Sequence, residues 1–450
     1  MSAGRAAPIL GALALVLAAC AGPVAPDAVP TAGADPASIT LPRSAPSSAD
    51  RTATSTPEPV IPTSTTAPIP TVTTGTAEPG GPPARDPALD QPLRDAAWAD
   101  DVARAAQLIA AGADVNAKDG TQQSAYLIAT SEGYLDLLEL TLANGADLTS
   151  LDSYRGTGLI RAGERGHADV VGRLLRAGID INHVNRPGWT ALDEAIVYGD
   201  GSPSYVDTVR ALIAGGADLD RVASDGRTPR QNALRQGQDA VVAALTAGTR
   251  PPPADPAAAL LTAAADGDAD AAAAALRAGA PIESRDAGGR TPLLLAATND
   301  HVDLARLLVV LGADPDALDD RRDSAWLVTG VTGSVAMLEA LLPAGPDLTL
   351  TNRFGGVSVI PASERGHVDY VRRVVQTGID VNHVNDLGWT ALLEAIVYGD
   401  GSAPYQQIVD ILLAAGADPR IADAQGVTPL QHARSRGQDE IATRLAAAGG

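Results

Sequence analysis

A short motif recurs at a nearly constant spacing along most of this chain. Hexapeptides such as AGADVN (111–116), AGIDIN (177–182) and LGADPD (311–316) recur at steps of about 33 residues almost everywhere from residue 93 onward. A period of this length is typical of a solenoid, in which each small unit buries its apolar face only against its neighbours. A long chain built in this way needs no single large core.

Each unit repeats the same local signals. A Thr-Pro or Thr-Ala pair opens a first short helix, because threonine suits the N-cap and proline suits the first helical turn. A turn follows, and a second helix then carries paired apolar residues one turn apart. Glycine after the second helix suits the left-handed C′ position, as at Gly112, Gly178 and Gly312. The predicted N-cap threonines are Thr190, Thr228, Thr291, Thr390 and Thr428.

These signals resemble the pattern of ankyrin repeats. The segment GRTPLLLAATNDHVDLARLLVVLGADPD (289–316) matches that pattern best, and the resemblance extends over roughly residues 93–450. It implies an all-α solenoid of helix-turn-helix units joined by β-turn fingers, with binding of another protein as the usual function. In most units the histidine that normally follows Thr-Pro-Leu is replaced, for example by Asp193 and Leu393.

We count about eleven units and predict two tandem arrays. The first covers residues 93–248 with about five repeats, and the second covers 257–450 with about six. A proline-rich junction at 249–256 separates them. Each array opens with a shortened, cap-like unit, as expected where a solenoid ends. The alternative is one continuous curved stack with a kink at 250–256.

The strongest internal similarity is a duplication at an offset of 200 residues. NHVNRPGWTALDEAIVYGDGS (182–202) is matched by NHVNDLGWTALLEAIVYGDGS (382–402), a closer agreement than the repeat pattern requires. Each string contains a finger and continues into a loop, YGDGSPSY (198–205) or YGDGSAPY (398–405). The loop is expected to add about five residues between the two helices of its unit.

We predict that the duplicated string is a binding surface presented twice. Asn and His side chains offer hydrogen-bond donors and acceptors, and Trp and Tyr supply contact area with few rotamers to lose. Two alternatives remain open: the aromatic and GDGS residues serve packing and turn formation, or the duplication is recent and has drifted little. The candidate residues are Asn182, His183, Asn185, Trp189, Tyr198 and Asp200, with their counterparts Asn382, His383, Asn385, Trp389, Tyr398 and Asp400.

The first residues have the features of an export signal. Arg5 precedes an apolar run at 9–19 that is too short for a permanent membrane-spanning helix. The run ends in Leu-Ala-Ala-Cys and resembles the lipobox of a bacterial lipoprotein. The resemblance implies a signal peptide at 1–19 and lipidation of Cys20, the only cysteine. The alternative is an ordinary secretory signal with a chance cysteine.

Residues 20–92 are predicted to be a disordered tether. From residue 21 to 92 the chain holds 16 of its 33 prolines and 12 threonines. Proline lacks a backbone N–H and fixes φ, so neither helices nor central strands persist in such a segment. We expect a partly polyproline II chain that separates a folded module from the membrane.

The composition argues against several partners and reactions. The 33 Lys and Arg stand against 54 Asp and Glu, a net charge of −21, which disfavours nucleic acid as a partner. The sequence has no Gly-rich phosphate loop followed by lysine, no His-Glu-x-x-His and no Gly-x-Ser-x-Gly. One cysteine cannot form a four-thiolate zinc site. We therefore predict no catalytic residues, no cofactor and no metal.

The predicted function is a non-enzymatic protein-binding module held on the exported side of a bacterial membrane by lipid at Cys20. That side is the outer face of the cytoplasmic membrane, or the periplasmic or outer-membrane side in a Gram-negative host. The alternatives are an accessory or inhibitor of one secreted or envelope enzyme, a scaffold with one ligand for each array, and a cell-wall glycan binder that uses Trp189 and Trp389.

Overall fold

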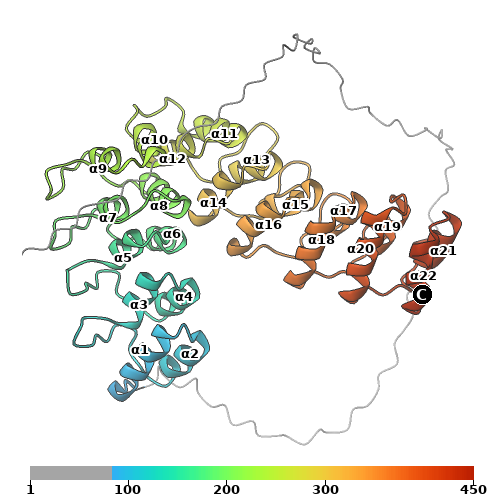
Figure 1. Ribbon diagram of the computed structural model, residues 1–450, viewed down its shortest axis with the longest axis horizontal. Coiled ribbons are helices and arrows are strands. Elements are labelled where there is room, and N and C mark those ends of the chain that lie inside the picture. Colours follow the sequence, from blue (N-terminus) through green and yellow to red (C-terminus); the bar gives the residue numbers. More distant parts are fainter. Residues whose placement is uncertain (1–83) are drawn as a thin grey trace, which may run out of the picture. The chain divides into compact units, whose positions relative to one another are not determined.

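Helices are the regular elements of residues 84–450, the part of the chain that this computed structural model describes (Figure 1). The α-helices α1 to α22 form consecutive pairs, each joined by a short turn, and no strand occurs in this range. Extended loops connect one pair to the next. This arrangement confirms the predicted all-α solenoid of helix-turn-helix units.

The first ten α-helices make five pairs. Their first helices are α1 (Asp90–Trp98), α3 (Ala125–Glu132), α5 (Gly158–Glu164), α7 (Ala191–Val197) and α9 (Pro229–Gln236). Their second helices are α2 (Val102–Ala110), α4 (Leu135–Ala143), α6 (Ala168–Arg176), α8 (Pro203–Ala214) and α10 (Asp239–Gly248). A 3-10 turn, η1 (Pro87–Leu89), precedes α1.

The remaining helices make six pairs. Their first helices are α11 (Pro256–Asp266), α13 (Pro292–Thr298), α15 (Ala325–Thr332), α17 (Val359–Glu364), α19 (Ala391–Val397) and α21 (Pro429–Ser435). Their second helices are α12 (Ala269–Arg277), α14 (Val302–Val310), α16 (Val335–Leu341), α18 (Val368–Val374), α20 (Ala403–Ala414) and α22 (Asp439–Ala447). The 3-10 turns η2 (Leu342–Ala344) and η3 (Val375–Thr377) extend α16 and α18.

The helix ends follow from the residues that stand there. Thr291 Oγ1 accepts a hydrogen bond from Leu294 N at 3.1 Å, and all five predicted threonines cap their helices in this way. Pro229, Pro292 and Pro429 occupy the first turn, where no backbone N–H is needed. The predicted left-handed glycines are confirmed, with φ of 84° at Gly178.

Stacking of like helices on like helices builds the core. First helices pack on first helices from α1 to α9 and again from α11 to α21, and second helices pack on second helices. The buried residues are mainly Leu, Ile, Val and Ala. Three aromatic side chains, Tyr126, Trp326 and Tyr370, are fully buried among them. Apolar side chains of modest size therefore fill a core that runs along the stack.

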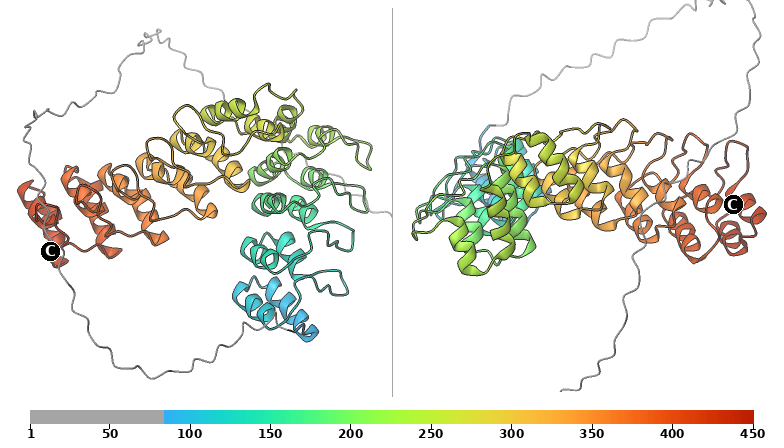
Figure 2. Two further views of the ribbon diagram at one scale, coloured as in Figure 1. Left: turned by 180° about the vertical axis from the view of Figure 1, so that it is seen from behind. Right: turned by 90° about the horizontal axis from the view of Figure 1, so that it is seen from above.

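The stack changes direction between α9 and α11. These two first helices make almost no contact, whereas α12 packs against both α8 and α10, and α14 packs against α6 and α8. The second helices of both groups therefore meet at one junction (Figures 1 and 2). All of these helices belong to one compact unit. The predicted boundaries of the two arrays stay a prediction, and the structure adds how the two groups of helices meet.

Ion pairs and a close backbone approach hold this junction. Arg210 Nε lies 2.7 Å from Asp270 Oδ1, and Arg277 Nη1 donates to Ala217 O at 2.6 Å. A Cβ at Gly172 of α6 would lie closer than 3 Å to the backbone carbonyl of Val310 in α14. Only glycine allows α6 to approach α14 so closely.

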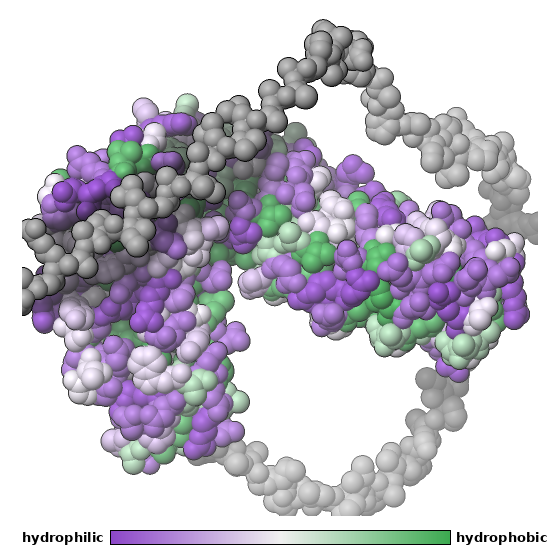
Figure 3. Space-filling view, in the orientation of Figure 1, coloured by the Kyte–Doolittle hydropathy of each residue, from purple (hydrophilic) through white to green (hydrophobic). Residues whose placement is uncertain are grey.

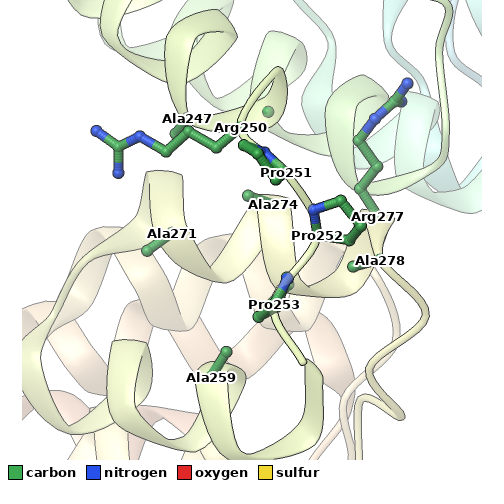
Figure 4. A pocket seen from close by; sticks show the side chains of 12 residues that line it. Ala247, Arg250, Pro251, Pro252, Pro253, Ala259, Ala271, Ala274, Arg277 and Ala278 are labelled. Atoms are coloured by element: carbon green, nitrogen blue, oxygen red, sulfur yellow. The ribbon is translucent and has the colours of Figure 1, made fainter. Parts of the chain in front are cut away.

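An apolar cavity of about 540 Å³ lies beside the junction, between α10, α11 and α12. The proline triplet 251–253 forms one wall, and alanines such as Ala247, Ala259 and Ala274 form much of the rest (Figure 4). Because proline cannot continue a helix, this triplet separates α10 from α11.

The folded region begins earlier than the sequence indicates. The disordered tether was predicted to reach residue 92, but η1 starts at Pro87 and α1 at Asp90. Asp86 caps η1 by accepting from Ala88 N at 3.0 Å, and Arg85 pairs with Asp90 at 2.6 Å. These local side-chain bonds offset the cost of ordering a proline-containing segment.

The predicted signal peptide, Cys20 and most of the tether lie outside the described residues. Within residues 84–450, no helix combines the length and the apolar character that crossing a membrane requires.

Candidate functional site

The duplicated string forms the same local structure in both copies, leading into α7 in the first and α19 in the second. In the first finger, Asn185 N donates to Trp189 O at 3.0 Å, and Asn185 Oδ1 accepts from Trp189 N at 2.9 Å. Asn385 and Trp389 make the same two bonds at the same distances. The asparagine thus closes the finger, and it is buried in both copies.

Asn182 and His183 link neighbouring fingers. Asn182 Oδ1 accepts from Asp218 N at 2.9 Å, and His183 Nε2 lies 2.8 Å from Arg155 O. The counterparts behave alike: Asn382 Oδ1 accepts from Asp418 N at 2.8 Å, and His383 Nε2 lies 2.6 Å from Gly355 O. Each of the four side chains therefore has a partner within the chain, and part of its hydrogen-bonding capacity joins neighbouring fingers.

An aromatic pair stands beside each finger. The Trp189 and Tyr198 ring centroids are 5.6 Å apart, and those of Trp389 and Tyr398 are 5.4 Å apart. Tyr198 is 60% exposed and Tyr398 54%, so both rings present area to solvent. The tryptophans are half-buried. Of the predicted contact residues, the two tyrosines are the best placed to meet a partner.

Asp200 and Asp400 shape the turn that follows. Both are exposed, and each accepts from the backbone N–H of the serine two residues later at 2.9 Å. The predicted eight-residue loop is shorter in the structure, because α8 begins at Pro203 and α20 at Ala403. Helix α8 has 12 residues where α6 has 9, so the extra residues lengthen the second helix as well as the turn.

Each copy also forms a pocket between successive fingers, beside the first helices. The first-copy pocket has a volume of about 210 Å³ and the second-copy pocket about 240 Å³. All ten lining residues of the first pocket have counterparts 200 positions later in the lining of the second. Three of these pairs differ in chemistry: Asp152 and Asn352, Arg161 and Pro361, and Pro187 and Leu387. The shared lining residues are Tyr154 and Phe354, Gly156 and Gly356, Ile160 and Ile360, Glu164 and Glu364, Asn185 and Asn385, Glu194 and Glu394, and Tyr198 and Tyr398.

A buried glutamate lies in each pocket. Glu194 is 5% exposed and Glu394 is 4% exposed, and burial raises the pKa of each carboxyl to about 7. Asn185 Nδ2 donates to Glu194 Oε1 at 2.6 Å, and Asn385 Nδ2 donates to Glu394 Oε1 at 2.9 Å. Glu194 Oε2 is buried and has no hydrogen-bond partner. The first-copy pocket therefore contains one buried oxygen that has no partner among the described residues.

The two pockets differ in the arginine that lines them, which is Arg161 in the first and Arg365 in the second. In the first, Arg161 pairs with Asp152 and also with Glu164, at 2.5 Å, and its guanidinium carbon lies 5.5 Å from the centre of the Tyr154 ring. The second copy has Pro361 in place of Arg161 and Asn352 in place of Asp152. There Glu364 pairs with Arg365 at 2.7 Å instead. Arg365 is itself a lining residue of the second-copy pocket, and the guanidinium carbon of Arg353 lies 4.8 Å from the centre of the Phe354 ring.

The sequence analysis missed the glutamates and the ring at position 154 or 354. A signal for the glutamates was present, since Glu164 and Glu194 recur at the same offset of 200 residues as the rest of the string. In the second copy, Glu394 is also the only charged residue of the helix ALLEAIV. A charge that both copies of a duplicated helix carry between buried positions marks a candidate site as clearly as the tryptophans did.

The visible face of the described residues in Figure 3 is mostly polar, with smaller apolar patches between the polar areas. Within residues 84–450, no group of three or more His, Cys, Asp or Glu side chains is arranged to hold a metal ion. The rings of Tyr154, Tyr198, Phe354 and Tyr398 are each more than half exposed. Exposed rings beside buried carboxylates are therefore the distinctive chemistry of the duplicated surface.

Comparisons with known proteins match the fold described above. The family model described as "Ankyrin repeats (3 copies)" matches residues 126–223, 159–255 and 326–423, and the single "Ankyrin repeat" model matches 288–320. The ankyrin repeat protein YahD of Escherichia coli K12 is 41% identical over 190 residues, which are 42% of this chain and 94% of YahD. Mouse ankyrin repeat domain-containing protein 63 is 38% identical over 96 residues, 20% of this chain and 25% of that protein.

Two solved structures are also similar. The crystal structure of an ankyrin repeat domain from Acinetobacter baumannii AYE shares 48% identity, covers 42% of this chain and 97% of its own, and gives a TM-score of 0.41. The ankyrin repeat protein EF0377 shares 37% identity with the same coverages and the same TM-score.

Proposed function

This chain belongs to the ankyrin-repeat proteins, and we propose that it presents their protein-binding surface on the exported face of a bacterial membrane. Ankyrin repeats are protein–protein interaction modules and are generally not enzymes. The observation that carries the proposal is the surface that the chain presents twice, with Tyr198 or Tyr398 exposed at the rim of a pocket.

This surface suits recognition of a folded or extended protein. Its fingers are tied to their neighbours by Asn182, His183 and their counterparts, so docking freezes little motion of the backbone. Tyrosine supplies contact area and a hydroxyl at a low cost in side-chain entropy. The net charge of −21 favours a basic or neutral partner and an association rate that falls as salt is added.

Membrane display is supported by the resemblance of Leu17-Ala18-Ala19-Cys20 to a lipobox. A lipid on Cys20 would anchor the chain, and residues 21–83 would separate the repeats from the membrane surface. Cells that express the protein with labelled palmitate are expected to label the parent chain and to leave a Cys20→Ser variant unlabelled. Equal labelling of both would remove lipid attachment at Cys20 from the proposal.

Binding is tested with the full-length protein, immobilised and exposed to envelope and culture-fluid proteins of its host. One protein retained at a fixed molar ratio is expected, and the Tyr198→Ala/Tyr398→Ala variant should retain much less of it. Val222→Ala is the matched control, because Val222 is 60% exposed and lies outside the duplicated string. Circular dichroism shows whether all forms are folded. Equal retention by both variants would move the binding surface elsewhere, and retention of cell-wall glycan in place of protein would contradict the proposal.

A further inference from the structure

The junction cavity, between α10, α11 and α12, has small side chains in its wall where the next unit has large ones. Its volume is about 540 Å³, and alanine and proline make up most of the wall (Figure 4). At four lining positions in and just after α12, alanine stands where the next unit has leucine 33 residues later. These pairs are Ala271 and Leu304, Ala274 and Leu307, Ala275 and Leu308, and Ala278 and Leu311. Because alanine is shorter than leucine, α12 leaves open a space that leucine side chains would occupy.

The cavity reaches the surface on the side of the proline triplet. Arg250, Pro251 and Pro252 are exposed, whereas Ala247 and Ala275 are buried. Cavities of about 300 to 1,000 Å³ with mainly apolar walls are typical of small-molecule sites. Alanine and proline side chains offer neither hydrogen-bond donors nor acceptors, so the inner part of the cavity favours an apolar group.

The charged side chains that line the cavity are both cations. They are Arg250 and Arg277, and no Asp or Glu is among the described lining residues, although the chain has 54 Asp and Glu against 33 Lys and Arg. In Figure 4 the two arginine side chains extend away from the prolines in opposite directions. The cavity therefore combines an apolar interior with positive charge outside it.

Arg250 is the better placed of the two to meet an anion. Arg277 Nη1 already donates to Ala217 O at 2.6 Å. The ion pairs of the junction use Arg210 and Arg306, and within residues 84–450 none includes Arg250. Asp255, the next acidic residue along the chain, caps α11 by accepting from Ala258 N at 3.0 Å. The exposed guanidinium of Arg250 is thus available to a carboxylate from outside the chain.

We propose that the junction cavity binds an unbranched fatty acid, with its aliphatic chain against the alanines and prolines and its carboxylate beside Arg250. This inference goes beyond the proposed function, because it involves neither the fingers nor a partner protein. The lining side chains include no aromatic ring, so burial of methylene groups is the main source of affinity. The carboxylate sets the orientation through charge-assisted hydrogen bonds with the guanidinium.

The next unit supplies the substitutions that fill the cavity. Ala271→Leu/Ala274→Leu gives α12 the leucines that α14 has at these positions, and both alanines are only half-buried, so the added atoms enter the cavity. Ala243→Leu is its matched control, at an exposed position of α10 outside the lining. Arg250→Gln removes one charge and leaves the walls intact. Arg235→Gln is the control for it, since Arg235 is exposed on α9 and does not line the cavity.

The probes are octanoate, decanoate and dodecanoate, with decanol and decylammonium as the neutral and cationic controls. Calorimetry measures their affinity for the full-length protein. All forms carry Cys20→Ser, so that no lipid on the chain itself competes. Each two added methylenes should tighten binding by roughly tenfold until the cavity is full. Decanoate should bind about tenfold more tightly than decanol, and decylammonium should bind more weakly than both.

The variants and the position of the ligand test the site itself. Ala271→Leu/Ala274→Leu should weaken decanoate at least about tenfold, and Ala243→Leu should leave it unchanged. Arg250→Gln should bring decanoate close to decanol, whereas Arg235→Gln should not. With decanoate that carries bromine on its last carbon, anomalous scattering from soaked crystals should place the bromine between α10, α11 and α12. Thermal melts establish that the variants are folded.

Several outcomes would overturn the inference. They are no heat of binding from any of the three acids, bromine at another place, or an affinity that Ala271→Leu/Ala274→Leu leaves unchanged. Decylammonium that binds as tightly as decanoate would contradict an anionic ligand. If the double-leucine variant does not fold, Arg250→Gln and the bromine position still decide. None of these measurements depends on retention of a protein, so the proposed function stands or fails separately.

Discussion

The units that contain the two copies of the duplicated string agree in their fingers and first helices and differ in their second helices. The finger and the first helix carry nearly the same residues in both, from Asn182 or Asn382 onward. The second helices diverge: Gly172 of α6 corresponds to Arg372 of α18, and Val206 of α8 to Gln406 of α20. Duplication alone does not explain why, in the unit that contains the string, the second helix differs more than the finger and the first helix do.

The surroundings of the two second helices explain it. Helices α6 and α8 lie at the junction, where α12 and α14 pack against them, so Gly172 and Val206 are buried. No helix of the described residues covers α18 in this way, and Arg372 is exposed there. Equivalent positions of the second helices are therefore buried at the junction in the first copy and more exposed in the second. The second helices of the two copies differ in surroundings, because only those of the first copy pack against α12 and α14.

The largest expected effect comes from moving the exposed residue of one copy into the buried position of the other. Gly172→Arg should destabilise the protein by roughly 5 kcal/mol, because any side chain there meets the backbone of Val310 and the charge would be buried. The reverse change, Arg372→Gly, should cost only about 1 kcal/mol, the usual cost of glycine in an exposed helix. Urea denaturation measures both. Similar losses from the two changes would show that the junction does not distinguish the copies.

Removing the internal cation of the first pocket should have the next largest effect. Arg161→Ala leaves the Asp152 carboxylate, whose side chain is 1% exposed, without its ion-pair partner, and the expected loss is about 4 kcal/mol. Adding Asp152→Asn removes the unpaired charge and should recover most of the lost unfolding free energy. Pro361→Ala is the control in the second copy and should change the unfolding free energy by less than about 1 kcal/mol. If Arg161→Ala is as stable as Arg161→Ala/Asp152→Asn, the ion pair between Arg161 and Asp152 does not stabilise the fold as expected.

The buried glutamates should make stability depend on pH. In the folded chain the pKa of Glu194 and that of Glu394 are each about 7, against 4.5 for a free glutamate side chain. The folded state therefore holds protons that the unfolded chain has lost between about pH 4.5 and 7. The contribution of each glutamate to the unfolding free energy is fully present below this pH window. It falls by roughly 3 kcal/mol for each glutamate as the pH rises through the window.

Glutamine at these positions tests the sign of this dependence. Glu194→Gln and Glu394→Gln should each flatten the curve of unfolding free energy against pH. At pH 8 each variant should be more stable than the parent. Denaturation at a series of pH values measures this. The two variants should behave alike, because burial is the main cause of the raised pKa in both copies. A variant that is more stable than the parent at pH 4 but not at pH 8 would contradict a raised pKa of the buried glutamate.

The smallest expected difference concerns the two tryptophans. Trp189 Nε1 donates to Ser224 Oγ at 2.8 Å, whereas Trp389 Nε1 is buried without a partner because Ala424 stands at the equivalent position. Ser224→Ala should lower the unfolding free energy by about 1 kcal/mol. Ala424→Ser should raise it by a similar or smaller amount. Thermal denaturation of the two variants checks this exchange. A loss in both would show that the site around Trp389 has no room for the hydroxyl.

Much of the fold was predictable because its determinants are local. Threonine caps, proline in the first turn and glycine after the second helix act within a few residues of their own position, and the period of 33 residues repeats them. The start of the folded region was placed too late because Pro87 and Pro92 were taken as signs of disorder. In fact Asp86 and the Arg85–Asp90 pair hold the chain there.

The site was predictable only in part. The duplication drew attention to a string in which Tyr198 and Tyr398 are exposed, as a contact surface requires. Asn182, Asn185 and His183, in contrast, make hydrogen bonds within the chain that a one-dimensional pattern does not show. Residues from an earlier finger, such as Tyr154 and Asp152, enter the pocket from about 30 to 40 positions before Asn185 and Glu194.

The sequence by itself determined the repeat unit, its helix ends and the existence of two related copies, because these depend on short-range bonds and a regular apolar pattern. Only the tertiary structure decided that the second helices meet at a junction, that Glu194 and Glu394 are buried beside exposed rings, and that Arg161 lines one pocket whereas Arg365 lines the other. These features depend on which distant side chains share a space. Burial and charge act over distances in space, and the order of residues along the chain does not contain them.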